Sequence, residues 1–190
     1  MIPPPASDIA PNDGLKTFVL AGGCFWGVQG VYQHTKGVTN AVSGYAGGKA
    51  STANYEATTR GNTGHAEAVQ ITYDPAKVTY QRLLDVFWHN IDPTSPDAQF
   101  CDHGTQYRSA IFFHDAEQQQ QAQASLRAIA ESKRLPAPIV TQLEPLKRFY
   151  PAEDYHQDFY KKNPGRYTSY RTGCGRDRRL QELWGVSPAH

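Results

Sequence analysis

The stretch GGCFWG, from Gly22 to Gly27, places a cysteine between glycines and two large aromatic side chains. It follows the apolar run TFVLA, so Cys24 stands where an expected strand ends and an expected helix begins. Unpaired N–H groups and the positive end of the dipole at a helix N-terminus favour thiolate, the nucleophilic form of cysteine. Cys24 is therefore a candidate nucleophile, and the neighbouring glycines would let a substrate approach the backbone. The alternative is a structural cysteine packed among core aromatics.

A second candidate is Glu67, which lies in the alternating segment Ala66–Tyr73, a pattern typical of a strand. It shares one strand face with the apolar residues Val69 and Ile71. A carboxyl group that continues an apolar face is desolvated, which favours its protonated form and predicts a general acid near neutral pH. The alternative is a strand-end glutamate that points into solvent. His65, on the same face, is interpreted as a capping or hydrogen-bonding residue.

Two further segments combine a cysteine with polar side chains. CDHGTQYRS begins at Cys101 and includes Asp102 and Tyr107 in a loop before an expected strand, where functional residues often lie. YRTGCGRDRRL places Cys174 between two glycines in a basic tail, whose arginines favour thiolate. A flexible thiol can travel to another sulfur, so Cys174 is a candidate second thiol, with an incidental surface thiol as the alternative. Cys101 is interpreted as a buried packing residue, or alternatively as a thiol close to Cys24.

Eight expected elements would position these residues. Their order is β-α-β-β-α-β-α-β, which predicts an α+β fold. We expect two layers, a mixed and mostly antiparallel sheet and the helices that pack on it. After Pro145 the pattern dissolves, so residues 144–190 are predicted to form a long irregular tail wrapped over the domain. Residues 1–14 are predicted to be a flexible arm and residues 15–190 a single catalytic domain. The strands are expected at residues 17–21, 39–45, 66–73, 109–113 and 139–143, and the helices at residues 25–33, 79–91 and about 115–132.

The composition excludes several classes of protein. The 19 basic and 18 acidic residues give a net charge of +1, which offers no electrostatic case for nucleic acid or an anionic membrane. No apolar run reaches the roughly 18 residues that a transmembrane helix needs. The proline-rich start does not read as a signal peptide, so a cytoplasmic monomer is expected, with an exported mature form as the alternative. Three cysteines indicate thiol chemistry or plain burial and not a disulfide framework.

Taken together, the motifs resemble those of the A-type peptide methionine sulfoxide reductase family. The family hallmark GCFWG stands at residues 23–27. It is followed in order by GYAGG, TGHAEAVQITYDP, GTQYRSAIFF and AEDYHQDFYKKNP, so the resemblance covers roughly residues 15–185. Five blocks in the same order make a very specific match. The resemblance implies a ferredoxin-like plait, which is consistent with the expected order of elements.

The resemblance also implies a reaction. Cys24 would attack the sulfur of methionine-S-sulfoxide, free or within a protein, and Glu67 would donate a proton to the sulfoxide oxygen. The hydroxyl groups of Tyr55 and Tyr107, together with Asp102, would assist that step. No metal and no tightly bound cofactor are implied.

Two aromatic side chains and a second thiol complete the implied site. Phe25 and Trp26 would hold the S-methyl group of the substrate. Release of methionine would leave a sulfenic acid on Cys24, and Cys174 would condense with it to an intramolecular disulfide. A thioredoxin would then restore both thiols. The implied partners are therefore oxidised proteins, free methionine sulfoxide and thioredoxin.

Two other classes of function fit parts of the sequence. A zinc-dependent nucleobase deaminase uses an H-x-E fragment, which His65 and Glu67 match, but it also needs a P-C-x-x-C segment that is absent from the chain. A peptide-binding module would explain the 11 Tyr, 8 Phe and 3 Trp residues. It would not explain cysteines flanked by glycines.

Overall fold

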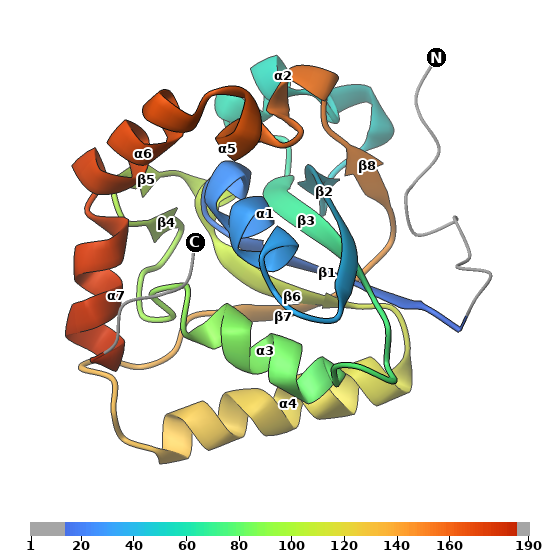
Figure 1. Ribbon diagram of the computed structural model, residues 1–190, viewed down its shortest axis with the longest axis vertical. Helices are drawn as coiled ribbons and strands as arrows, with labels where there is room; N and C mark the ends of the chain where they lie inside the picture. Colours follow the sequence, from blue (N-terminus) through green and yellow to red (C-terminus); the bar gives the residue numbers. More distant parts are fainter. Residues whose placement is uncertain (1–13, 186–190) are drawn as a thin grey trace.

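A six-stranded sheet forms the centre of the protein in the computed structural model, which describes residues 14–185 (Figure 1). The strand order is β7-β6-β1-β3-β2-β8. Residues 1–13 of the predicted arm lie outside the described residues, so the division into an arm and a catalytic domain stays a prediction. The strands are β1 (Lys16–Gly22), β2 (Val38–Ala46), β3 (Ala66–Tyr73), β6 (Ser109–Phe113), β7 (Gln142–Pro145) and β8 (Phe149–Pro151).

The four central strands and two helices form the ferredoxin-like plait that the sequence predicts. β1 pairs antiparallel with β3 and with β6, and β2 pairs antiparallel with β3. Helix α1 (Phe25–Gln33) connects β1 to β2, and α3 (Tyr80–Trp88) follows β3. After α4 (Ala116–Glu131), β7 adds to β6 in parallel, and β8 adds antiparallel to β2. The sheet is therefore mixed, and the α+β class is confirmed.

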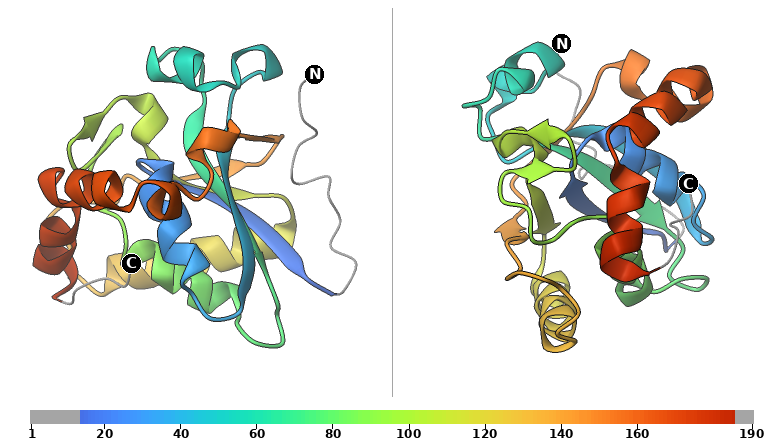
Figure 2. Two further views of the ribbon diagram at one scale, coloured as in Figure 1. Left: turned by 45° about the horizontal axis from the view of Figure 1, so that its top comes forward. Right: turned by 90° about the vertical axis from the view of Figure 1, so that its left-hand side faces the viewer.

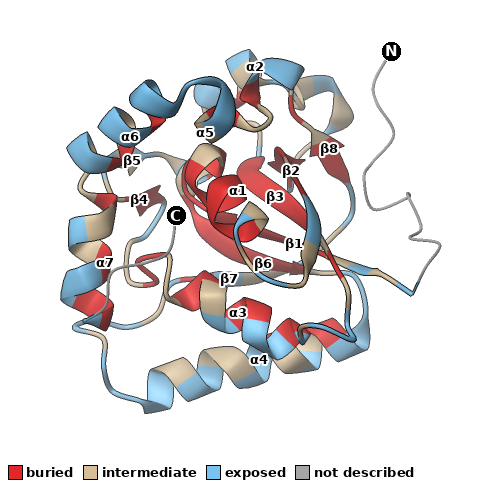
Figure 3. Cartoon of the chain, viewed as in Figure 1, coloured by how far each residue is buried: buried red, intermediate tan, exposed pale blue. Residues whose placement is uncertain are grey.

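The two faces of the sheet carry different side chains because residues alternate along each strand. In β1, Phe18 and Leu20 join the larger core cluster with α1, α3 and α4, whereas Val19 and Ala21 lie on the opposite face in a smaller cluster of alanines and two phenylalanines. Figure 3 shows the sheet and α1 as buried and most of α4 as partly or fully exposed. α1 therefore lies in the middle of the core, which places its first turn in a dry environment.

Several short elements lie near the ends of the central strands. β4 and β5 pair antiparallel as a separate two-stranded sheet. Within residues 14–185, none of the helices is both long and apolar enough to cross a membrane. The short elements are η2 (Ala50–Thr52), α2 (Tyr55–Thr59), β4 (Ala98–Gln99), β5 (Asp102–His103) and η3 (Thr105–Tyr107).

The C-terminal segment is not irregular, which corrects the prediction for residues 144–190. After β8 it forms η4 (Asp154–His156), α5 (Phe159–Lys162), α6 (Pro164–Gly173) and α7 (Arg176–Trp184). α7 buries Leu180, Leu183 and Trp184 in a small cluster of its own. The segment does wrap over the central sheet, since β8 pairs with β2 while α6 and α7 follow one side of the molecule (Figures 1 and 2).

The last predicted strand lies later in the chain than expected. The sequence predicts a strand at residues 139–143, but β7 begins at Gln142, which pairs with Ala110 of β6. The preceding segment pairs elsewhere, because the backbone N–H of Val140 donates to the carbonyl of Pro93 at 2.7 Å. Pairing with a loop therefore replaces the start of the expected strand.

Candidate active site

Cys24 lies at the junction between β1 and α1, where the sequence places it. It is the N-cap residue of α1 and only 8% exposed. The turn before it requires glycine, because Gly23 has φ of +86° and a Cβ there would lie 2.6 Å from Cβ of Gln99. The glycine thus fixes a sharp bend that directs the thiol into a buried space at the end of the helix.

Glu67 faces this thiol from β3. Its side chain is 2% exposed, and its Oε1 accepts a hydrogen bond from the backbone N–H of Phe25 at 3.1 Å. The alternative of a glutamate in solvent is excluded. Burial raises the pKa of Glu67 to about 8, the charge of Asp102 adds to this effect, and the Phe25 N–H opposes it. The carboxyl group therefore carries a proton at neutral pH, as a general acid must.

The pKa of Cys24 differs from the sequence-based expectation. The helix N-terminus was expected to favour thiolate, but burial raises the pKa of Cys24 far above its usual range, and the charge of Glu67 raises it further. The backbone N–H of Trp26 and the hydroxyl of Tyr170 lower the pKa of Cys24, but it remains above its usual range. Desolvation of a charged sulfur outweighs the helix terminus here. The resting residue is a thiol that must lose its proton during the reaction.

Two tyrosines and an aspartate surround this pair. Burial raises the pKa of Tyr55 to about 12, and the charge of Glu67 is the next cause. Burial raises the pKa of Tyr107 well above its usual range, followed by the charges of Glu67 and Asp102. Both hydroxyl groups therefore stay protonated and available as donors. The structure thus brings Tyr55, Asp102 and Tyr107 together around the thiol and the carboxyl group.

Phe25 and Trp26 form the aromatic wall of the site. The Phe25 ring is buried and stacks with Tyr55 at a centroid distance of 6.5 Å. The Trp26 ring stacks on Phe159 at 3.8 Å, and its indole N–H donates to Nδ1 of His156 at 3.0 Å. The orientation of the indole is therefore fixed from two sides.

Tyr170 and His156 belong to the site but were not predicted from the sequence. Tyr170, in α6, donates its hydroxyl proton to Asp102 and lies within hydrogen-bonding range of the Cys24 sulfur. His156 holds Trp26 and also contacts the ring of Tyr55 at 4.3 Å. His156 lies in the block AEDYHQDFYKKNP, which was a signal for it. Tyr170 is the first residue of the segment YRTGCGRDRRL, which was selected for Cys174 and not for the tyrosine.

Cys101 and Cys174 form a disulfide, and Cys24 is a free thiol. The interpretation of Cys101 as a buried packing residue is wrong, because the residue is exposed and bonded to Cys174. Cys174 does not lie in a loose tail either. It caps the C-terminus of α6, and Gly175 is the N-cap of α7. The second thiol is therefore paired with a third one near the surface.

The zinc pattern of a deaminase does not form. Both ring nitrogens of His65 form hydrogen bonds with the backbone. Nδ1 accepts from the N–H of Gly48 at 3.1 Å, and Nε2 lies 2.8 Å from the carbonyl oxygen of Lys49. This confirms His65 as a hydrogen-bonding residue. Among the described residues, the cluster with metal-ligand spacing is Cys101, Asp102 and Cys174, and its two sulfur atoms are bonded to each other.

Comparison with known sequences agrees with this site. The family model described as peptide methionine sulfoxide reductase matches residues 16–187. The chain is 56% identical over 154 residues to peptide methionine sulfoxide reductase MsrA 2 of Mesorhizobium japonicum, which covers 80% of this chain and 78% of that protein. It is 47% identical over 172 residues to peptide methionine sulfoxide reductase MsrA of Bacillus subtilis, with 90% and 96% covered.

Comparison with solved structures gives the same result. Mxr1 of Saccharomyces cerevisiae in reduced form matches with a TM-score of 0.70 and 34% identity, over 82% of this chain and 89% of that one. Mxr1 in complex with Trx2 matches with a TM-score of 0.55 and 25% identity, over 78% and 87%. The predicted activity, an oxidoreductase that reduces methionine sulfoxide, is confirmed. The chain belongs to the peptide methionine sulfoxide reductase family.

Proposed function

We propose that Cys24 and Glu67 reduce methionine-S-sulfoxide and that Cys101 and Cys174 return Cys24 to a thiol. The observation that carries the proposal is the buried carboxyl group of Glu67, protonated at neutral pH and held by the Phe25 backbone N–H at the end of α1 beside Cys24. A proton donor and a nucleophile in one dry site are what oxygen transfer from a sulfoxide needs.

In the first step, the Cys24 sulfur attacks the sulfoxide sulfur while Glu67 donates its proton to the sulfoxide oxygen. The sulfur–sulfur bond that forms, and the S–O bond of the substrate, then break as the protonated oxygen bonds to the Cys24 sulfur. The thiol proton of Cys24 passes to the Glu67 carboxylate, so the carboxyl group ends the step protonated. Oxygen leaves with the Cys24 sulfur, which gives a sulfenic acid and a methionine thioether. The hydroxyls of Tyr55 and Tyr107 hold the oxygen as negative charge develops on it.

The aromatic wall selects the substrate. We assign the S-methyl group to the space beside Phe25 and Trp26, because an apolar group is favourable there and a charged one is not. Tyr55, Tyr107 and Glu67 then bind the oxygen on one side of the sulfur. A fixed methyl group and a fixed oxygen accept one epimer at sulfur, and we assign the S epimer, both in free methionine sulfoxide and in proteins.

In the second step, the Cys174 thiol condenses with the sulfenic acid: its sulfur bonds to the Cys24 sulfur, the S–O bond breaks, and the hydroxyl group leaves as water with the thiol proton. The Cys101 thiolate then attacks Cys174, which forms the Cys101–Cys174 disulfide and releases Cys24 as a thiolate that takes up the proton lost by Cys101. Two observations support this route. The disulfide joins Cys101 to Cys174 while Cys24 is free, and Cys174 follows the site residue Tyr170 by one helical turn, with its N–H bonded to the Tyr170 carbonyl at 2.8 Å.

The last step needs an external dithiol, and we propose thioredoxin. Support comes from the complex of the relative Mxr1 with Trx2 and from the surface position of the disulfide, where Cys101 is exposed. A thioredoxin thiolate attacks one sulfur of the disulfide, and its second thiol completes the exchange. We also propose that the protein works in the cytoplasm, because thioredoxin keeps thiols reduced in that compartment.

Substitution of Cys24 tests the proposal. Cys24→Ser is expected to release no methionine from methionine-S-sulfoxide with dithiothreitol, because a hydroxyl does not replace the sulfur nucleophile. Resolved epimers are supplied separately, and near-ultraviolet circular dichroism checks the fold. Methionine release above a few per cent of wild type by the folded variant would remove Cys24 from this role, and equal rates for the two epimers would contradict the assignment of the methyl group.

A further inference from the structure

Arg176 is a buried cation to which residues 14–185 supply no counter-charge within ion-pair distance. It follows Cys174 by two residues, begins α7 and is 3% exposed. Among residues 14–185, no carboxylate lies within ion-pair distance of its guanidinium group, and its buried Nε has no hydrogen-bond partner. Burial, followed by the positive charge of Arg171, lowers the pKa of Arg176 to about 10, so the side chain is still charged at neutral pH. Burial of such a charged group costs free energy, so a role for the side chain is expected.

The guanidinium group contacts the segments of all three cysteines. One nitrogen donates to the carbonyl of Gly22 at 3.2 Å, two residues before Cys24, and to the carbonyl of Asn90 at 2.7 Å. The same group lies over the ring of Phe100 at 4.7 Å, and Phe100 directly precedes Cys101. Since Arg176 itself lies two residues after Cys174, a single side chain bridges the nucleophile and both recycling thiols.

The glycines of the motif make room for this side chain. A Cβ at Gly27 would lie 3.5 Å from the guanidinium carbon of Arg176. A Cβ at Gly23 would lie 3.6 Å from one of its terminal nitrogens. The turn that carries Cys24 therefore rests directly on the guanidinium group, and a thiolate at Cys24 lies within electrostatic range of it.

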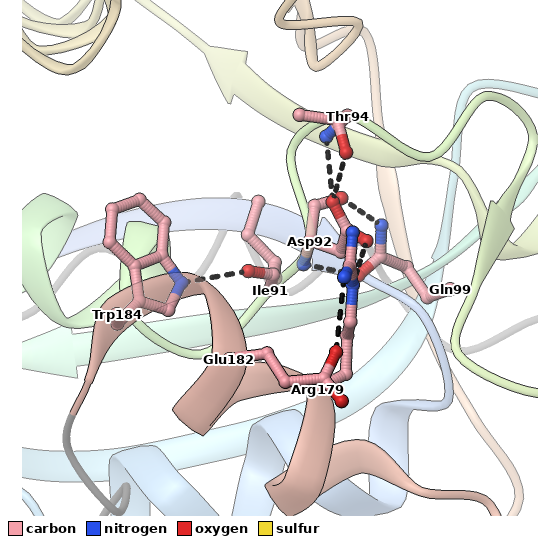
Figure 4. Close-up of polar contacts among 7 residues, drawn as sticks. All are labelled: Ile91, Asp92, Thr94, Gln99, Arg179, Glu182 and Trp184. Carbon is pink, nitrogen blue, oxygen red and sulfur yellow. Dashed lines mark hydrogen bonds and ion pairs between the residues drawn. The ribbon is translucent and has the colours of Figure 1, made fainter. Parts of the chain in front are cut away.

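The rest of α7 is held by other contacts, which Figure 4 shows. Arg179 donates to Asp92 at 3.0 Å, and the indole N–H of Trp184 donates to the carbonyl of Ile91 at 3.2 Å. Asp92 in turn is bound by Thr94 and Gln99 (Figure 4). These contacts attach the helix to the loop after α3 through Asp92 and the Ile91 carbonyl, independently of the Arg176 side chain. Loss of Arg176 thus leaves the helix attached and removes only the bridge.

We propose that Arg176 is a positioning residue that holds the Cys24 turn against the segments of Cys101 and Cys174, so that a thiol captures the sulfenic acid rapidly. The inference rests on the proposed function, because capture follows methionine release. Without the bridge, the sulfenic acid on Cys24 still forms, but the second thiol captures it more slowly. A misplacement of about 1 Å costs on the order of 100-fold in such a step.

Arg176→Met tests the bridge, because it keeps an apolar stem of similar length and removes the hydrogen bonds and the charge. Reduced enzyme is mixed with less than one equivalent of methionine-S-sulfoxide. Methionine release reports the first step, and a dimedone adduct at Cys24, followed over time by mass spectrometry, reports the lifetime of the sulfenic acid. We expect methionine release within about threefold of wild type and a sulfenic acid that persists at least about tenfold longer, since only the second step loses its positioning.

Arg179→Gln is the matched control on the same helix, and it should leave the lifetime within about threefold of wild type. Arg176→Lys, which retains a charge, should give a shorter lifetime than Arg176→Met. If Arg176→Met does not fold, Arg176→Lys is judged against the same tenfold limit. The proposal is overturned if the folded Arg176 variant captures the sulfenic acid at the wild-type rate, or if Arg179→Gln slows capture as much. Failure of wild type to release methionine would instead overturn the proposed function.

Discussion

Cys24 and the Cys101–Cys174 disulfide place cysteine sulfur atoms in opposite surroundings. Cys24 and its partner Glu67 are 8% and 2% exposed, whereas Cys101 lies at the surface. Burial at the first site raises the pKa of both the thiol and the carboxyl group, so that protons are held until a substrate needs them. At the second site, exposure lets another protein reach a sulfur atom.

The two steps of the reaction need different surroundings, which explains why one enzyme has two sulfur sites. Oxygen transfer benefits from excluded water and fixed donors in a space that a partner protein cannot enter. Thiol–disulfide exchange with a partner needs an accessible sulfur. Passing the oxidation from Cys24 to the exposed pair lets each site keep the environment that its step requires.

Loss of the buried proton donor should have the largest effect. Glu67→Gln keeps the shape of the side chain and removes its transferable proton, so the single-turnover rate of methionine release should fall by about 10²–10⁴-fold. Glu153→Gln is the matched control, because Glu153 binds the Tyr55 backbone N–H and the Tyr45 hydroxyl without serving as the proton donor. Rates for Glu67→Gln within about threefold of wild type would show that another group supplies the proton.

Removal of either surface thiol should block recycling and spare the first turnover. Cys174→Ser and Cys101→Ser should each release one methionine per enzyme, because that step consumes only Cys24. With thioredoxin, steady-state turnover should then fall below a few per cent for Cys174→Ser, and dithiothreitol should partly restore it by attacking the sulfenic acid. Cys101→Ser should stall as a Cys24–Cys174 disulfide. Normal thioredoxin-dependent turnover by either variant would break the division between buried and exposed sites.

The pH dependence should report the buried carboxyl group. Glu67 must be protonated to act as an acid, and its pKa is raised to about 8. The single-turnover rate should therefore be level below about pH 8 and fall about tenfold for each pH unit above it. Exchange at the exposed disulfide should instead speed up over the same range as thiols ionise. A first-step rate that falls through about pH 4–5, where a free glutamate titrates, would contradict the buried acid.

Loss of the Tyr170 hydroxyl should have the smallest effect of this series. Tyr170→Phe removes a donor to Asp102 and a contact with the Cys24 sulfur while the ring remains. A hydrogen bond of this kind contributes about 0.5–1.5 kcal/mol, so the first step should slow by roughly 2–10-fold. Tyr167→Phe, one turn earlier in α6, is the control. An unchanged rate in Tyr170→Phe would mean that its contact with Cys24 plays no part in the reaction.

Local signals in the sequence predicted the centre of the fold well. The helix at residues 25–33 and the strand at residues 109–113 lie where they were expected. The alternation of β3 correctly placed Glu67 on the face of Val69 and Ile71, because strand parity depends only on neighbouring residues. The positions of the nucleophile and of its acid therefore follow from short stretches of sequence.

Features that depend on distant contacts were not predictable in the same way. The disulfide joins residues 73 positions apart, and α6 approaches β5 there, since the Tyr170 hydroxyl donates to Asp102. α6 contains Pro164, Gly165 and several β-branched or small residues, which give little helical signal. The sequence of α7 did carry a helical signal, since Leu180, Leu183 and Trp184 recur at helical spacing. The high pKa of Cys24 follows from burial, which the helix terminus alone does not reveal.

The order in which disulfides form during one turnover distinguishes the buried site from the exposed pair. Fully reduced enzyme is mixed with one equivalent of methionine-S-sulfoxide, quenched with an alkylating agent at increasing times, digested and analysed by mass spectrometry. We expect that Cys24 appears first as a sulfenic acid, then in a disulfide with Cys174, and finally as a free thiol while Cys101 and Cys174 are joined. An end state in which Cys24 remains oxidised and Cys101 remains a thiol would contradict this order.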